Sequence, residues 1–264
     1  MEEIKQLRER TGAGMVDCKK ALEEAGNDIE KAIEILRKKG IAKAAKRAER
    51  EAKEGVIKVI TNEAKTTGYI LELNSETDFV ARNEKFQEFG NQALELAKDN
   101  QTDSLETLIR LNLNGLSLQD SLASLSGVIG EKLGFGRYAV LKGESVGSYS
   151  HLGGMIAVLV ALDKPGKTEL ANDIAMHIAA ANPRYLNPED VNPEELAKEE
   201  AIYREQLVKE GKPENIMENI MKGKVAKFYN EVCLTKQEYI KDDKKKVEEI
   251  LGDAKIVSFI RYSL

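Results

Sequence analysis

An internal repeat is the feature of this sequence that most restricts its fold. Residues 154–159, Gly-Met-Ile-Ala-Val-Leu, resemble residues 68–73, and residues 250–259 resemble residues 132–141 in placing a Leu-Gly pair before a strand-like run. The two matches keep their order, but the second pair is more widely separated along the chain. The sequence therefore predicts two similar units, the second of which contains an insert.

Short strand-like runs indicate the class of fold within each unit. Residues 56–60 and 69–73 are rich in β-branched and apolar residues and flank a polar turn, so they predict a hairpin. Residues 105–125 are rich in leucine and predict a helical region, and residues 137–141 predict a later strand. We therefore expect an α+β fold whose duplicated core combines antiparallel strands with helices.

Three short helices are expected before the first strand. A break at Thr11–Gly14 separates the first helix from the second, and Gly26 is placed to end the second. Asn27 can cap the third helix while Glu30 completes a capping box, and Gly40 is placed to end it. The alanine-rich, basic stretch that follows has no strong apolar stripe, which favours a helical linker.

The insert of the second unit has the pattern of two helices joined by a turn. Asn192 can cap a helix in which Pro193 takes the first position, and Gly211–Pro213 forms the turn before the chain returns. We expect an antiparallel coiled-coil hairpin that projects from the core. The predicted organisation is a three-helix module, a helical linker, two core subdomains and the insert, at residues 1–40, 41–54, 55–143, 144–264 and about 190–228 respectively.

The charge balance disfavours a general nucleic-acid-binding surface. Acidic residues number 45 against 40 basic ones, and the isoelectric point is about 5.4. Basic charge is concentrated locally between Arg37 and Glu54. A solvated linker helix is the favoured interpretation of that run.

The sequence lacks the usual patterns of a catalytic or metal site. Cys18 and Cys233 are far apart, and two histidines complete no recognisable zinc motif. His177 lies in a run of small apolar residues and is expected in the core, whereas His151 is expected in the turn that opens the second hairpin. No phosphate-binding loop, signal peptide or long apolar run is recognisable, so we expect a cytoplasmic protein with no cofactor and no covalent chemistry.

The junction between the strand at 69–73 and the next helix allows two interpretations. Thr77 can cap a helix that carries Phe79 in its first turn, or Asn83 can cap a helix that begins later. Phe79 also lies seven residues before Phe86, so it could belong to the buried stripe of that helix. The spacing alone leaves open whether Phe79 is a core residue or projects on a short turn.

Three motifs resemble the elongation factor Ts family. Residues 76–81, Glu-Thr-Asp-Phe-Val-Ala, resemble its Thr-Asp-Phe-Val signature, and residues 7–22 resemble its amino-terminal module, whose fold is similar to ubiquitin-associated (UBA) domains. Residues 147–151, Gly-Ser-Tyr-Ser-His, match a further family motif. The resemblance implies a duplicated core with a coiled-coil protrusion and a guanine-nucleotide exchange partner of elongation factor Tu in its GDP-bound and nucleotide-free states.

The same resemblance implies roles for individual residues. Phe79 would be an apolar wedge entering the GTPase domain, and Asp78 would add a polar contact that helps displace the segment holding Mg²⁺. Thr77 and Val80 would fix the turn. The remaining partner-binding residues implied by the family pattern are Val16, Asp17 and Lys19 in the amino-terminal module and Ile129, Gly130 and His151 in the core. No direct nucleic-acid or membrane contact is expected.

A second class of function stays open at this stage. A helical module, a basic linker and a protruding hairpin could form a non-catalytic scaffold, or an adaptor associated with RNA or the ribosome. The basic charge from Arg37 to Lys53 is the feature that supports it.

Overall fold

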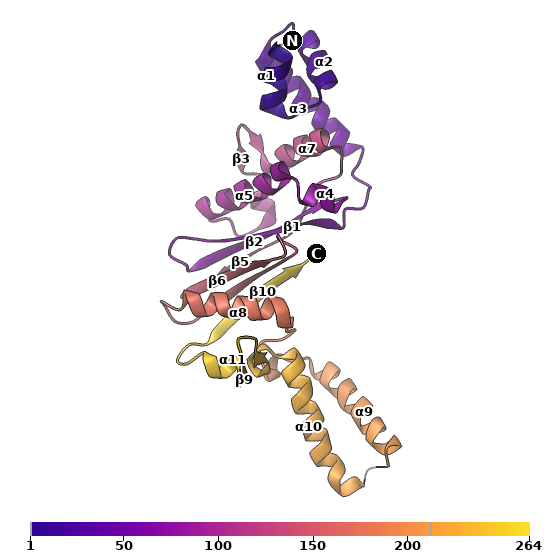
Figure 1. Cartoon of the computed structure of the whole chain (residues 1–264), viewed down its shortest axis with the longest axis vertical. Helices are drawn as coiled ribbons and strands as arrows, with labels where there is room; N and C mark the ends of the chain where they lie inside the picture. The colour runs from indigo at the N-terminus through magenta and orange to yellow at the C-terminus, as the bar shows by residue number, and fades with distance from the viewer. Residues whose placement is uncertain (1, 212) are drawn as a thin grey trace.

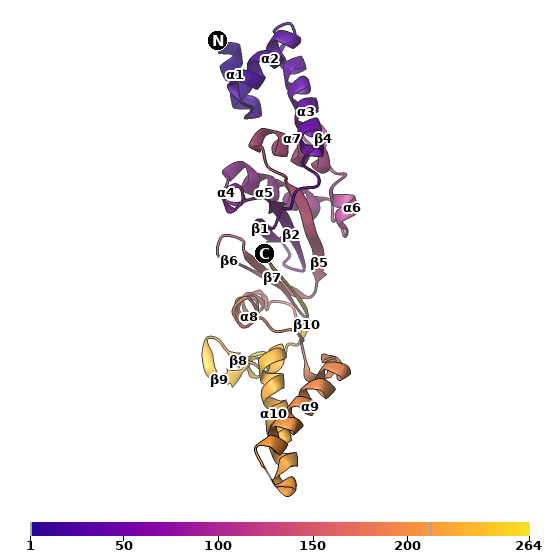
Figure 2. The ribbon, with the colours of Figure 1, turned by 90° about the vertical axis from the view of Figure 1, so that its right-hand side faces the viewer.

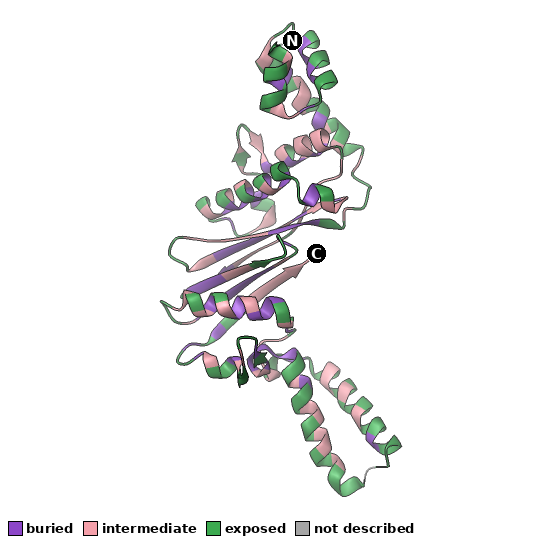
Figure 3. Ribbon diagram, in the orientation of Figure 1, coloured by how far each residue is buried: buried purple, intermediate pink, exposed green. Residues whose placement is uncertain are grey.

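A computed structural model describes residues 2–211 and 213–264. The molecule is elongated, with the amino-terminal helices at one end and a pair of long helices at the other (Figures 1 and 2). Two units of helices and antiparallel strands lie between them, and buried residues concentrate in their sheets and in the helix faces that cover the sheets (Figure 3). The class is α+β, as the sequence predicts.

The amino-terminal module contains the helices α1 (Glu2–Thr11), α2 (Met15–Glu24) and α3 (Ile29–Ala45) around a small apolar cluster. Asp28, not Asn27, caps α3 by accepting a hydrogen bond from the backbone nitrogen of Lys31 at 3.1 Å. The expected cap at Asn27 is wrong because this residue has φ of 66° and forms the turn before the helix.

The third helix is longer than the sequence predicts. It continues through Gly40 to Ala45, and residues 46–53 form turns and coil. The expected helix end at Gly40 is therefore wrong, and the helix expected over 41–54 extends only to Ala45. The reason is tertiary packing: α3 lies across α7 (Leu118–Ile129) of the core, and a glycine without a side chain permits this contact. The domain boundaries themselves stay a prediction.

The first core unit contains an antiparallel sheet in the order β1-β2-β5. Its strands are β1 (Glu54–Thr61), β2 (Thr67–Ser75) and β5 (Gly134–Lys142), which confirms the predicted hairpin and later strand. The helices α5 (Glu84–Asp99) and α7 contribute to its apolar core. Between β2 and α5 lies the short helix α4 (Asp78–Ala81).

The leucine-rich region of the first unit is not continuously helical. The helix α6 (Leu105–Leu108) is followed by a small hairpin of β3 (Asn112–Leu113) and β4 (Leu116–Ser117), and α7 begins only at Leu118. Asn114 and Gly115, with φ of 53° and 85°, form the hairpin turn. The helix expected over 105–125 is confirmed at 105–108 and from 118 onward, and it is interrupted between them because the Asn-Gly pair favours this turn.

The second unit repeats the topology of the first. Its sheet has the order β10-β7-β6, formed by β6 (Ser145–His151), β7 (Ile156–Leu162) and β10 (Ile256–Ser263), with α8 (Thr168–Ala181) on one face. In each unit a hairpin comes first and a later strand pairs with its second strand. A shared apolar cluster that includes Ile57 and Leu159 joins the two sheets.

The insert contains α9 (Pro193–Lys209) and α10 (Glu214–Val232), which run side by side away from the core (Figure 1). Asn192 caps α9 by accepting from the nitrogen of Glu194 at 2.9 Å, and Pro193 takes the first position as predicted. Residue 212, within the expected turn, lies outside the described residues. The shorter elements of this unit are η1 (Pro188–Asp190), η2 (Leu234–Lys236), β8 (Glu238–Tyr239), β9 (Asp242–Lys246) and α11 (Val247–Ile250).

Candidate interaction site at the strand-to-helix turn

The turn after β2 uses both of the caps that the sequence offers. The Thr77 hydroxyl accepts from the nitrogen of Val80 at 3.4 Å and caps α4. The Asn83 side chain then accepts from Lys85 and Phe86 nitrogens at 3.0 and 3.4 Å and caps α5. Both caps considered from the sequence are therefore used: Thr77 caps α4, which is a separate single turn, and Asn83 caps α5.

Phe79 projects from this turn into solvent. Its exposed fraction is 82%, whereas Val80, Ala81 and Phe86 are buried. The core interpretation of Phe79 is therefore wrong. The seven-residue spacing to Phe86 fails as a helical repeat because the chain leaves helical geometry at Asn83 and begins a new helix.

Asp78 lies beside Phe79 on the half-buried side of the turn. Its carboxylate forms an ion pair with Arg82 at 3.2 Å, one turn later, and the arginine is exposed. Exposed pairs of this type contribute at most about 1 kcal/mol. The carboxylate can therefore exchange this partner for another at low cost.

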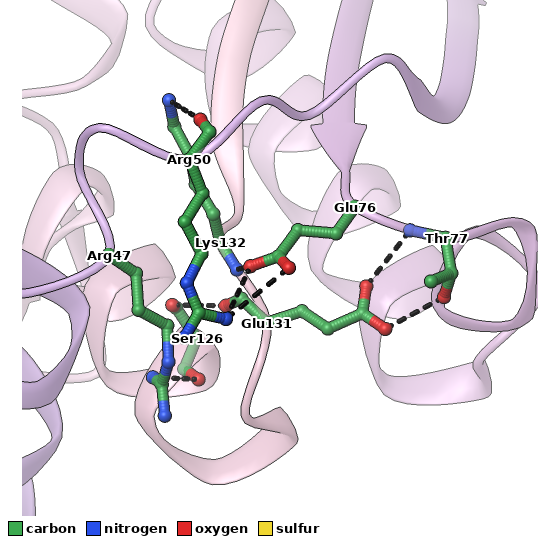
Figure 4. A network of polar contacts seen from close by, with 7 residues as sticks. All are labelled: Arg47, Arg50, Glu76, Thr77, Ser126, Glu131 and Lys132. Atoms are coloured by element: carbon green, nitrogen blue, oxygen red, sulfur yellow. Dashed lines mark hydrogen bonds and ion pairs between the residues drawn. The ribbon is translucent and has the colours of Figure 1, made fainter.

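A carboxylate from a distant segment holds the beginning of the turn. Glu131 accepts a hydrogen bond from the Thr77 nitrogen at 3.1 Å through one oxygen and from the Thr77 hydroxyl at 2.7 Å through the other (Figure 4). The preceding residue, Glu76, accepts from the Lys132 nitrogen at 2.5 Å and pairs with Arg50 at 3.2 Å. The hydrogen bond from Lys132, followed by the contact with Arg50, lowers the pKa of the Glu76 carboxyl.

The segment that follows α3 belongs to the same polar network. Lys132 donates through Nζ to the carbonyl of Arg50 at 2.7 Å, and Arg47 donates to the carbonyl of Ser126 at 3.3 Å (Figure 4). Sequence reasoning missed Arg50, Glu76 and Glu131. Thr77 and Glu131 are 54 residues apart, and no local pattern links them.

The structure brings Ile129 and Gly130 close to the turn, through their neighbour Glu131. Gly130 is exposed and ends α7 with φ of 93°, and Ile129 is partly buried against the first core. Because Glu131 follows directly and bonds to Thr77, these two residues lie beside the base of the Phe79 turn.

His151 lies in the hairpin of the second core unit. It is the last residue of β6 rather than a turn residue as expected, and it pairs with Ile156 across the hairpin. Its ring stacks on Tyr149, with the hydroxyl 3.1 Å from Nδ1. The loop that follows rests on β1 through a 2.7 Å hydrogen bond from the Ile57 nitrogen to the Gly154 carbonyl. Leu152 and Met155 in this loop are exposed apolar side chains, and their exposure was not predicted from the sequence.

The predicted residues of the amino-terminal module form a separate group on α2. Val16 is exposed, Asp17 pairs with Lys43 at 3.1 Å, and Lys19 lies 3.8 Å from Glu23. In Figure 1, α2 lies at the end of the molecule opposite α9 and α10, with α4 between them.

The polar groups that could suggest chemistry have structural explanations. His177 is fully buried, with Nε2 3.0 Å from the Gln237 side chain and Nδ1 accepting from the Ile240 nitrogen, which confirms the expected core histidine. Burial lowers its pKa. Cys18 and Cys233 are free and buried. Within residues 2–211 and 213–264, no group of acidic, histidine or cysteine side chains is arranged to hold a metal ion, and no helix could cross a membrane.

The fold is a duplicated α+β core from which an exposed aromatic side chain projects on a tethered turn, a feature typical of proteins that bind other proteins. The family described as Elongation factor TS matches residues 76–264. Elongation factor Ts of Chlorobaculum parvum is 45% identical over 100% of this chain and 97% of its own length. The proteins of the same name from Nitratiruptor sp. and Deinococcus deserti are 45% and 42% identical, covering 99% and 100% of this chain and 92% and 99% of their own lengths. The chain belongs to the elongation factor Ts family and is a translation elongation factor.

Proposed function

We propose that this protein is the guanine-nucleotide exchange factor of elongation factor Tu and acts in the cytoplasm. It binds the GDP complex of that GTPase, disturbs the Mg²⁺ and phosphate site, and leaves as GTP binds. The observation that carries the proposal is the exposure of Phe79 on a turn whose backbone is held by caps and by Glu131.

The proposed activity needs binding energy and no covalent step. A GTPase holds GDP through its phosphate loop and a Mg²⁺ ion that bridges phosphate and protein. A partner that weakens this binding is itself weakened by nucleotide to the same degree, because coupling between two binding sites is reciprocal. GTP therefore displaces the factor, and one molecule of factor serves many molecules of GTPase.

Phe79 and Asp78 are proposed to act at the nucleotide site. An aromatic side chain that enters a pocket of a partner can contribute 2 kcal/mol or more to the complex. Asp78 can exchange its surface ion pair with Arg82 for a contact that helps displace the segment holding Mg²⁺. Thr77 and Val80 hold the backbone of the turn, the first as its cap and the second as its buried side chain.

Other surfaces are proposed to add affinity rather than exchange. Val16, Asp17 and Lys19 present the exposed side of α2 for docking on the GTPase domain. Ile129, Gly130 and His151 extend the contact around the Phe79 turn. The helices α9 and α10 add contact area at the other end of the molecule.

The adaptor function is less well supported than exchange. Most cations of the run from Arg37 to Glu54 are already engaged within the chain. The contacts are Lys38–Glu34, Lys39–Glu24, Lys43–Asp17, Arg47 with the Ser126 carbonyl, Arg50–Glu76 and Lys53–Glu51. Because exposed pairs of this type contribute at most about 1 kcal/mol, they disfavour a phosphate-binding surface only slightly, and the excess of 45 acidic over 40 basic residues is the stronger argument against it.

Release of a fluorescent GDP analogue from purified elongation factor Tu tests the proposal. Addition of the protein should accelerate release at concentrations well below that of the GTPase, because the factor turns over. Binding to elongation factor Tu without accelerated release would support the scaffold function instead.

A further inference from the structure

Hydrogen bonds to Ser126 hold the backbone at Gly130 and at Glu131, so the point from which the Glu131 side chain extends is fixed. The nitrogen of Gly130 donates to the Ser126 carbonyl at 2.9 Å in the left-handed turn that ends α7. The Ser126 hydroxyl, which is buried, donates in turn to the carbonyl of Glu131 at 2.5 Å. The side chain of Glu131 therefore extends from an anchored loop toward the turn after β2.

The two oxygens of this carboxylate bind two different atoms of one residue. Oε2 accepts from the backbone nitrogen of Thr77 and Oε1 from its hydroxyl, at 3.1 and 2.7 Å. The same hydroxyl accepts from the Val80 nitrogen, so its proton is directed to Glu131 while its lone pair caps α4. Two simultaneous bonds to a charged acceptor fix both the position and the rotation of the cap residue.

Phe79 has little of its own to set its direction. Its ring is 82% exposed, and α4 is a single helical turn, which is not stable by itself in water. Val80 and Ala81 anchor the later side of the turn in the core. On the earlier side, the Thr77 carbonyl accepts from the Ser75 hydroxyl at 2.9 Å, and Glu131 is the group that bonds to both the nitrogen and the hydroxyl of Thr77.

We infer that Glu131 is a positioning residue for nucleotide exchange: it acts through Thr77 to hold the turn in the orientation from which Phe79 enters the partner. This inference rests on the proposed function. Because docking through α2 and α10 does not use the turn, loss of Glu131 lowers the maximal rate of GDP release more than it raises the concentration of factor that gives half of that rate. Glu131 holds the turn before the partner binds, so its loss lowers the rate of the step that uses the turn, which is GDP release, more than it weakens binding of the factor.

The variants are Glu131→Ala, which removes both acceptors, and Glu131→Gln, which keeps one. We expect Glu131→Ala to lower the maximal rate of GDP release from elongation factor Tu about three- to tenfold. A decrease of this size is expected if only about a third to a tenth of the variant molecules hold the turn in the orientation that Phe79 needs. Glu131→Gln should lie between this variant and the parent. Glu106→Ala is the charge-matched control: it removes an exposed glutamate of α6 that is paired with Arg110, and it should leave the rate of GDP release unchanged.

Hydrogen exchange in the free protein tests the positioning independently of any GTPase. In Glu131→Ala the amides of Thr77 and Val80 should exchange at least about threefold faster, with protection of α5 and β2 unchanged and thermal unfolding close to that of the parent. Unchanged protection at both amides would overturn the inference, whether or not the parent protein accelerates GDP release. A parent protein inactive in GDP release would refute the proposed function and the kinetic part of the inference together. If the parent is active and Glu131→Ala shows faster amide exchange but the same maximal rate of GDP release, the turn needs no positioning by Glu131. That result would also overturn the inference.

Discussion

Gly40 and Gly127 meet where α3 crosses α7, and a Cβ atom placed on Gly127 would lie 2.4 Å from the Cα of Gly40. Real Cβ atoms do not approach backbone so closely, so neither helix can come this near its partner with a side chain at position 127. The amino-terminal module is therefore attached to the core through a glycine contact as well as through the chain.

Gly127→Ala should separate the module from the core. Alanine favours the helix by about 1 kcal/mol over glycine, but overpacking against the Gly40 backbone costs about 1–3 kcal/mol. We expect residues 46–53, which follow α3 and include the Arg47 contact with Ser126 of α7, to become about tenfold more sensitive to trypsin, since 1.4 kcal/mol changes a population tenfold. The measurement is limited proteolysis with identification of the cleavage sites.

Gly223→Ala is the matched control for this experiment. Gly223 lies within α10, and a Cβ atom there would meet nothing within 4 Å. This variant should keep the parent's proteolysis pattern and gain up to about 1 kcal/mol of stability. Equal proteolysis of both variants and the parent would show that the glycine crossing does not hold the module.

The helical insert should be removable only if its base is kept. Val191, Phe228 and Val232 belong to a buried cluster with Cys233, so replacement of residues 190–226 by a short linker cuts into the core. We expect that deletion to cost about 1.5–3 kcal/mol through the loss of Val191. Replacement of residues 198–224 keeps the cluster and should leave the core's unfolding temperature nearly unchanged. Thermal unfolding of the two deletion variants compares them, and equal destabilisation would contradict this assignment of the base.

His177 should make stability depend on pH in the acidic range. Burial lowers its pKa in the folded state below the ordinary value of 6.5, so the unfolded state takes up the proton first. The contribution is fully present above pH 6.5 and is lost as the pH falls from there toward the folded-state pKa. We expect the free energy of unfolding of the parent to fall more steeply than that of His177→Gln between pH 7.5 and 5. Urea unfolding at several pH values measures this, and parallel curves for the two proteins would contradict it.

The parts of the fold that are determined locally could be predicted from the sequence. The hairpin at β1 and β2 and the Asn192 and Pro193 start of α9 depend on residues close in the sequence, and the small apolar neighbours of His177 already indicated its burial. The internal repeat also predicted the shared topology of the two sheets, because similar sequences form similar units.

The parts that depend on distant contacts could not be predicted in this way. Gly40 has the sequence character of a helix end, yet it lies within α3 because its missing side chain admits α7. Phe79 fits the stripe of Phe86 by spacing, and only the second cap at Asn83 shows that the two belong to different helices. The contact between Thr77 and Glu131 joins residues 54 positions apart, so no spacing pattern predicts it, although it holds the turn that carries Phe79.

Asp78→Ala should weaken exchange conditionally. The aspartate is proposed to help displace the segment of the partner that holds Mg²⁺, so its loss should slow GDP release by a few-fold when Mg²⁺ is present. Removal of Mg²⁺ by a chelator completes that step in advance, and the difference between variant and parent should shrink. A defect of equal size with and without chelator would exclude this role. Loss of the exposed pair with Arg82 should change stability by less than about 1 kcal/mol.

Phe86→Ala provides the stability control for the main experiment. Phe86 is fully buried seven residues after Phe79, so its truncation should cost about 3–5 kcal/mol through lost burial and a cavity. Phe79→Ala removes an exposed ring and should change stability by no more than about 0.5 kcal/mol.

The most direct test of the account measures GDP release from elongation factor Tu by Phe79→Ala beside its thermal unfolding. We predict unfolding close to that of the parent and acceleration of release at least about tenfold smaller, which corresponds to the loss of about 1.4 kcal/mol of contact made only in the complex. A Phe79→Ala protein that is equally stable and accelerates GDP release as well as the parent would contradict the account.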